Sequence, residues 1–267
     1  MAVAAALARR YIPESPRWLL ARGEGMNESR TSAPDRRQQA AADLISCYET
    51  LATRNENLLQ HVVGDSVFEC WRKYPSADAI DSHSGFQYFY HAHSADDRPG
   101  TLENGHFHTF ARFDRHSHDV EDWDVSACAG NDEAPGTWDP DSAHLIAISV
   151  NALGLPVGLF TVNRWVTGDR WCSGASLSRL VTRFDVRQTG PRIVARWLKA
   201  CFALYETEIQ ALLIERDAAI QRALAKRGPD PWVTEDRSLE VLSARTLSFS
   251  DDVEAAQCPA QAGRGRS

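Results

Sequence analysis

The sequence predicts an α+β fold in which an antiparallel sheet of about four strands is flanked by N-terminal helices and one long C-terminal helix. Three observations support this class. Apolar residues recur every three or four positions toward both ends of the chain, which is the period of an amphipathic helix. Between them, aromatic-rich segments alternate in polarity, as half-buried strands do. These segments follow one another without intervening helices, which favours an antiparallel meander.

The N-terminal helical region begins near Pro34, because proline suits the first turn of a helix. The first helix is predicted from one apolar stripe, which consists of Leu44, Ile45, Tyr48, Leu51 and Ala52. A second, shorter helix carries Leu58, Leu59, Val62 and Val63 and ends near Gly64. Residues 75–85 contain proline, glycine and many polar side chains, so we expect a loop there.

Four segments have the composition and alternation of strands, namely residues 86–93, 106–113, 144–151 and 157–166. The first two are joined by a short polar connection and the last two by residues 152–156, a length that suits a hairpin. A long acidic stretch rich in turn-forming residues separates the two pairs. The order therefore predicts four consecutive antiparallel strands.

The helical period returns after residue 174, with a short helix predicted over residues 175–184. Pro191 then opens the longest amphipathic segment, which runs to about Ala225 and is expected to cover one face of the sheet. We expect a single domain over residues 34–227. Residues 1–33 are predicted to be a disordered segment or an extension, and residues 228–267 a largely disordered tail.

Composition narrows the class of protein. The formal net charge of −7 makes nucleic acid a poor candidate partner, because an acidic chain repels phosphate backbones. The longest apolar runs fall well below the roughly 20 residues of a membrane helix, so no membrane partner is expected. The six cysteines are scattered and form no Cys-x-x-Cys pair, which favours free thiols and a cytoplasmic location. The oligomeric state is not readable from the sequence.

Two His-x-His pairs are the strongest functional signal. His91 and His93 lie in one predicted strand, and His106 and His108 in the next. Residues two apart share a face of a strand, so each pair directs two imidazoles to the same side. If the strands are neighbours, four histidines converge there. Neutral imidazole is a common ligand of zinc and iron, so these four residues are the candidate metal ligands.

Two other interpretations of the four histidines stay open. They can hydrogen-bond one another and nearby Tyr, Gln and Arg groups in a buried polar layer, or line a ligand pocket that holds no metal. His144, at the start of the third strand, adds a ligand only if it faces the same side. A further pair, His116 and His118, lies in the acidic stretch and is expected in a solvated loop.

The candidate functions belong to three classes. The first is a metal-dependent enzyme acting on a small anionic molecule, in which Arg112 or Arg164 holds the anion and Glu103 or Asp96 acts as a base. The second is a module that binds a metal or small ligand without turnover. The third is a structural protein whose histidines only pack. Nothing in the sequence decides whether the protein is an enzyme.

Three segments resemble the motifs of a family of uncharacterised bacterial proteins: Phe89-Tyr90-His91-Ala92-His93, Gly105-His106-Phe107-His108 and Asn163-Arg164-Trp165-Val166-Thr167-Gly168. The resemblance extends over roughly residues 35–225. It implies that this region is one unit, and it implies no reaction. The donors and rings of the third segment are expected at the rim of the histidine site.

Overall fold

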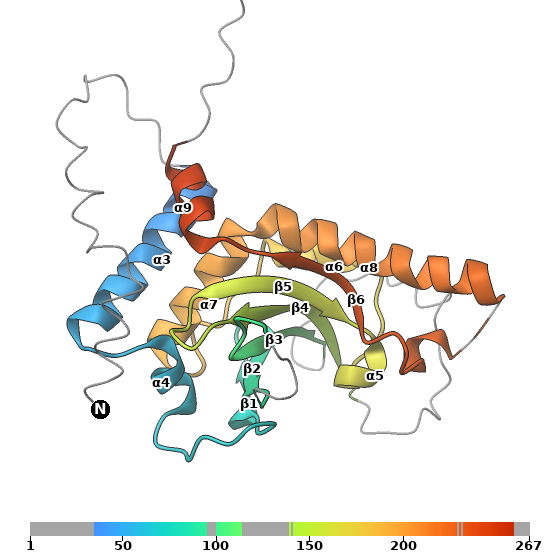
Figure 1. Cartoon of the computed structure of the whole chain (residues 1–267), viewed down its shortest axis with the longest axis horizontal. Helices are drawn as coiled ribbons and strands as arrows, with labels where there is room; N and C mark the ends of the chain where they lie inside the picture. Colours follow the sequence, from blue (N-terminus) through green and yellow to red (C-terminus); the bar gives the residue numbers. More distant parts are fainter. Residues whose placement is uncertain are drawn as a thin grey trace, which may run out of the picture.

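The computed structural model of the chain describes residues 35–94, 100–113, 139, 141–228, 230 and 232–258. Its strands form one six-stranded antiparallel sheet in the order β1-β2-β3-β4-β5-β6 (Figure 1). The strands are β1 (Tyr74–Asp81), β2 (Phe86–Ala92), β3 (Gly105–Arg112), β4 (Ser142–Val150), β5 (Pro156–Val162) and β6 (Val241–Thr246). The α+β class and the antiparallel meander predicted from the sequence are confirmed.

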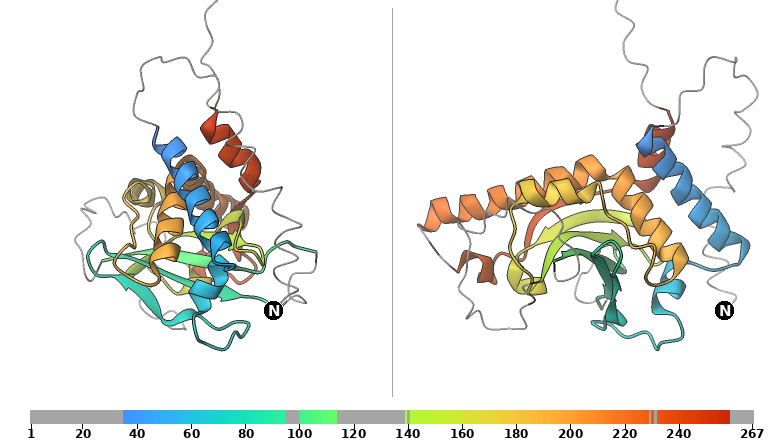
Figure 2. Two further views of the ribbon diagram at one scale, coloured as in Figure 1. Left: turned by 90° about the vertical axis from the view of Figure 1, so that its left-hand side faces the viewer. Right: turned by 180° about the vertical axis from the view of Figure 1, so that it is seen from behind.

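The helices pack around this sheet and around one another. They are α3 (Arg36–Thr53), α4 (Leu58–Val63), α5 (Arg164–Thr167), α6 (Gly174–Val181), α7 (Arg192–Leu204), α8 (Glu206–Arg227), the 3-10 turn η1 (Val233–Glu235) and α9 (Phe249–Gln257). Figures 1 and 2 show α6, α7 and α8 over the convex side of a strongly curved sheet, with α3 and α9 outside them. Within the described residues, no helix combines the length and the apolar character that crossing a bilayer requires.

The main core lies between the convex face of the sheet and the helices. Its residues alternate along the strands, with Tyr90, Phe107 and Ile148 fully buried toward the helices. The ring of Phe107 lies 5.2 Å from that of Trp197 in α7. Because side chains alternate across a strand, the residues between these positions face the concave side. The histidines of β2 and β3 are among them.

The sheet has two more strands than the four that the sequence predicts, and both lie at its edges. β1 occupies a stretch expected to be a loop. Proline and exposed polar residues are tolerated in an edge strand, and the pairing of β1 with β2 is irregular between Tyr74 and Ala79. β6 pairs with β5 at the other edge, and most of its side chains are exposed. Edge strands lack the clean alternation that identified the central four.

The prediction of a largely disordered tail over residues 228–267 is wrong for most of its length. β6 completes the sheet, and α9 packs against α3 with Val253 and Ala256 buried in the main core. Only short apolar patterns mark these elements in the sequence, since each buries one narrow side. Residues 259–267, and residues 1–33 of the predicted extension, lie outside the described part of the chain.

Two helical boundaries also differ from the sequence prediction. The long C-terminal segment is two helices, because α7 ends at Leu204 and α8 begins after Tyr205. The two parts pack on different partners, α7 on α3 and α8 on α6 and β6, which explains the change of direction. The last predicted strand ends at Val162, where Asn163 caps the single helical turn of α5 through a hydrogen bond to the Arg164 amide.

Candidate metal centre

The register of β2 and β3 brings the two His-x-His pairs together. His91 is paired directly with His106, and Phe89 with His108. This register places both pairs at the same end of the concave face. His93 follows immediately after β2 and continues the alternation.

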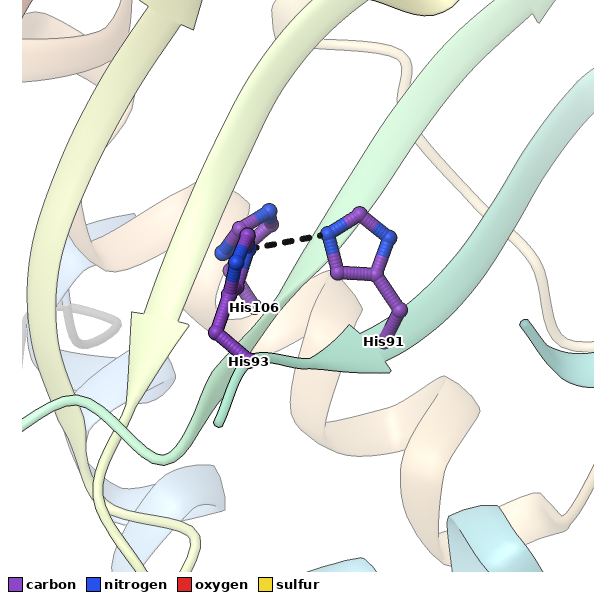
Figure 3. A group of neighbouring side chains, drawn as sticks. All are labelled: His91, His93 and His106. Carbon is purple, nitrogen blue, oxygen red and sulfur yellow. Dashed lines mark hydrogen bonds between the residues drawn. The ribbon is translucent and has the colours of Figure 1, made fainter. Parts of the chain in front are cut away.

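Three of the four predicted ligands form a group that is compact enough to share one ion. One ring nitrogen each from His91, His93 and His106 lies within 4.8 Å of the others, and Figure 3 shows the three rings turned toward one another. The Nε2 atoms of His91 and His93 are 3.2 Å apart. Two ligands of a tetrahedral zinc ion with bonds of about 2.0–2.1 Å are separated by about 3.3 Å. We call these three residues the histidine trio.

His93 is held from outside the sheet by Trp71. The two rings meet edge to face at a centroid distance of 4.2 Å, and the Trp71 amide donates to the Ala92 carbonyl at 2.8 Å. Trp71 has a positive φ of 66°, an uncommon conformation for a bulky residue. The segment before β1 therefore contributes one wall of the site, although its sequence gave no functional signal.

Glu103 orients His106. Its carboxylate accepts from His106 Nδ1 at 2.8 Å, and its other oxygen accepts from the Ser149 hydroxyl at 2.6 Å. Ser149 is the β4 residue directly opposite His106. With the Nδ1 proton committed to the carboxylate, the lone pair of His106 is on Nε2, the nitrogen available to a metal. The predicted base Glu103 thus contacts the site as an orienting residue.

His108 belongs to the same cluster and extends it away from the trio. Its Nε2 lies 3.0 Å from Nε2 of His106, and its Nδ1 lies 3.0 Å from Nε2 of His144. His108 and His144 are 1% and 3% exposed. The structure therefore brings all four predicted ligands together, but groups only three around one point.

A β-bulge gives His144 its place. Thr109 pairs with Ile146, but the next residue of β3, Phe110, pairs with His144, so Leu145 is the extra residue in β4. If Leu145 were instead paired in regular alternation, it would take the place on the histidine face and His144 would turn toward the helices. Its backbone amide donates to Asp169 Oδ2 at 2.6 Å, which ties β4 to the segment after α5.

Burial keeps the inner rings neutral. Desolvation, reinforced by the neighbouring histidines, lowers the pKa of His108 well below 6.5. Desolvation and the charge of Arg216 lower the pKa of His144 to about 3. Aromatic rings surround them: Phe89 lies 5.0 Å from His108, Phe160 4.9 Å from His106 and Phe110 5.3 Å from His144. Neutral imidazoles can act as metal ligands, whereas the lowered pKa values make these two rings poor proton acceptors.

The remaining site candidates lie farther out. Arg112 is on the same face, four residues beyond His108 along β3, and donates to Gln87 at 2.9 Å and to Asp139 at 2.8 Å. Arg164 is buried beside η1, where its Nε donates to Glu235 at 2.6 Å. The segment of residues 163–168, expected at the rim of the histidine site, instead binds the chain between η1 and β6, where Trp165 donates to the Leu239 carbonyl at 3.0 Å. Asp96, His116 and His118 lie outside the described residues.

Sequence reasoning missed Ser149, Asp169 and Trp71. Ser149 and Asp169 become recognisable only once the β3–β4 register and the bulge are known. No sequence pattern connects Trp71 with the histidines, and the structure places it beside His93 with 60% of its surface exposed.

Comparisons with known proteins place most of the chain in one family. The family described as "Domain of unknown function (DUF6969)" matches residues 38–247, a range that contains the histidine trio, Glu103, His108 and His144. No curated protein and no solved structure matches the chain.

Proposed function

Because the chain belongs to DUF6969, a family described only as a domain of unknown function, we propose its function from the site itself: it binds one transition-metal ion through His91, His93 and His106. The observation that carries this proposal is the convergence of three imidazole nitrogens from adjacent strands within 4.8 Å. Zinc and ferrous iron are the ions that such a set of nitrogen ligands suits.

The residues around the histidine trio also support metal binding. A carboxylate bonded to the far nitrogen of a ligating histidine fixes the ring and increases its basicity, and Glu103 stands in this relation to His106. Three protein ligands leave a coordination position for a water molecule or a substrate. At such a position a metal ion lowers the pKa of bound water or polarises a substrate oxygen.

We further propose that the site acts on a small anionic molecule. Arg112 lies on the same face as the histidines, and Lys73 is held over the ring of Phe89 at 4.1 Å. These cations lie beyond the aromatic rings that border His108, so an anionic group bound there would extend toward the trio.

One observation favours a second candidate, a histidine cluster that serves structure alone. The separations of 3.2 Å for His91–His93 and 3.0 Å for His106–His108 and His108–His144 are also those of hydrogen bonds. Such a network satisfies buried rings without an ion. Both candidates are compatible with a cytoplasmic location, which we also propose because the described cysteines are free thiols.

Elemental analysis of protein purified without a histidine tag separates the two candidates. We expect close to one equivalent of zinc or iron in the wild type, loss of that metal in His91→Ala and His93→Ala, and a chelator-induced drop in melting temperature only in the wild type. His83→Ala is the matched control, because His83 is exposed and lies outside the trio. Absence of metal after purification and after titration with zinc and ferrous iron would establish the structural cluster instead.

A further inference from the structure

A small, partly open pocket lies among the helices, between elements that contribute no residue to the histidine trio. It has a volume of about 250 Å³ and lies where the end of α3 and the short helix α4 meet the start of α7. Arg54, Arg192, Arg196 and His61 provide its polar lining. Three arginines, of which Arg54 and Arg192 are exposed and Arg196 is half-buried, therefore border one small, partly open pocket.

These three arginines have no carboxylate partner within the part of the chain that the structure describes. The arginines that form ion pairs there are at other positions: Arg36, Arg37, Arg72, Arg112, Arg164, Arg187, Arg216, Arg227 and Arg245. No acidic residue is among the described residues that line the pocket, and the carboxylate of Glu56 lies 2.8 Å from its His61. The chain has 36 acidic residues against 29 basic ones, so this positive pocket runs against its overall charge.

The N-terminus of α7 adds to the positive charge at the pocket. Arg192 is the first residue of α7, whose first turn has no acidic residue and whose N-cap, Pro191, makes no side-chain hydrogen bond. The start of a helix carries a partial positive charge, so cations there repel it and one another. An anion in the pocket would offset both repulsions.

We propose that this pocket binds a phosphate group, either as the free ion or as the phosphate end of a small ester. A guanidinium presents paired donors that match phosphate oxygens, and three of them suit a dianion better than a single carboxylate. The volume falls below the roughly 300–1,000 Å³ of pockets that enclose drug-sized ligands. The cavity therefore holds the charged group and leaves any remainder of the ligand outside. This inference does not depend on the metal centre.

Calorimetric titration of the full chain tests the proposal, with chelator present to remove any metal that would itself bind phosphate. The probes are inorganic phosphate, phenyl phosphate and benzoate at constant ionic strength. We expect one saturable phosphate site whose Kd rises about tenfold in Arg192→Gln and in Arg196→Gln, the loss of about one charge-assisted contact each. Arg222→Gln is the control, since Arg222 is exposed on α8 away from the pocket. Arg196→Lys, which keeps the charge, should recover part of the affinity.

The two phosphate probes identify the source of the group. Tighter binding of phenyl phosphate indicates an ester, and tighter binding of inorganic phosphate indicates the free ion, and both support the site. The proposal is overturned if phosphate does not bind, if benzoate binds as tightly, or if Arg222→Gln weakens binding as much as the pocket variants. The last result would mean that phosphate only screens surface charge. Circular dichroism of each variant establishes that it is folded.

Discussion

The two faces of the central strands are both buried, but by different means. On the helix face, Phe107 and Ile148 pack against apolar side chains, and removal of their surface from water stabilises the fold. On the opposite face, His106 and His108 are as deeply buried and carry polar nitrogens that cost free energy unless they are paired. The helix face therefore supplies most of the stabilisation of the domain, whereas the rings of the histidine face need partners, either one another or the metal ion that we propose.

The largest expected effect comes from the helix face. Phe107→Ala removes a ring that packs on Trp197 and leaves a cavity in the main core, so we expect the free energy of unfolding to fall by about 3–5 kcal/mol. Urea denaturation measures this loss. Metal stoichiometry, measured under conditions where the variant is folded, should not change. A loss of metal from folded Phe107→Ala would show that the two faces are not separable.

The second-largest expected effect is the loss of folding stability at acid pH, which we attribute to a histidine on the opposite face, His144. An unfolded histidine has a pKa near 6.5, whereas burial holds the pKa of His144 at about 3, so between these values only the unfolded chain takes up the proton. Stability is therefore complete above pH 6.5 and falls below it, by about 2.7 kcal/mol for this ring at pH 4.5. Urea titrations of chelator-treated wild type and His144→Phe from pH 7 to 4.5 measure this. If the two proteins lose stability in parallel, His144 is not responsible.

The third prediction concerns Glu103, whose replacement should change metal affinity and have the smallest effect of the three on the stability of the fold. Glu103→Gln keeps the size of the side chain but replaces the anionic acceptor of His106, so we expect metal affinity to fall by about 10–100-fold. Competition with a chromogenic zinc chelator gives the affinity. Ser149→Ala, which removes only the support of Glu103, should cost less. An unchanged metal affinity in Glu103→Gln would show that Glu103 does not contribute to metal binding.

Alternation made the site partly predictable from the sequence. The two-residue spacing of His91 and His93, and of His106 and His108, fixes a shared side for each pair in any strand. Which residues lie across from one another depends on register, which the polar connection between the strands does not specify. Alternation therefore identifies the cluster, and only the observed pairing separates the trio from His108.

The parts that the sequence did not predict depend on contacts between distant segments. Ser149 reaches Glu103 because β3 and β4 are neighbours, and β6 exists because β5 offers an open edge. Short, largely exposed elements such as β6 and α9 bury too little apolar surface to produce a readable pattern. The central sheet and its flanking helices bury much more, and the sequence predicted them.

The extra residue in β4 also has a consequence for how sequences of this family are aligned. Leu145 shifts the facing of every position before it in the strand, so Ser142 lies across from Arg112 and His144 across from Phe110. A relative that lacks the counterpart of Leu145 would have no bulge, and plain alternation would keep its counterpart of His144 across from that of Phe110 on the histidine face. An alignment that places its gap one position away from Leu145 would then compare a side chain on the histidine face with one in the main core.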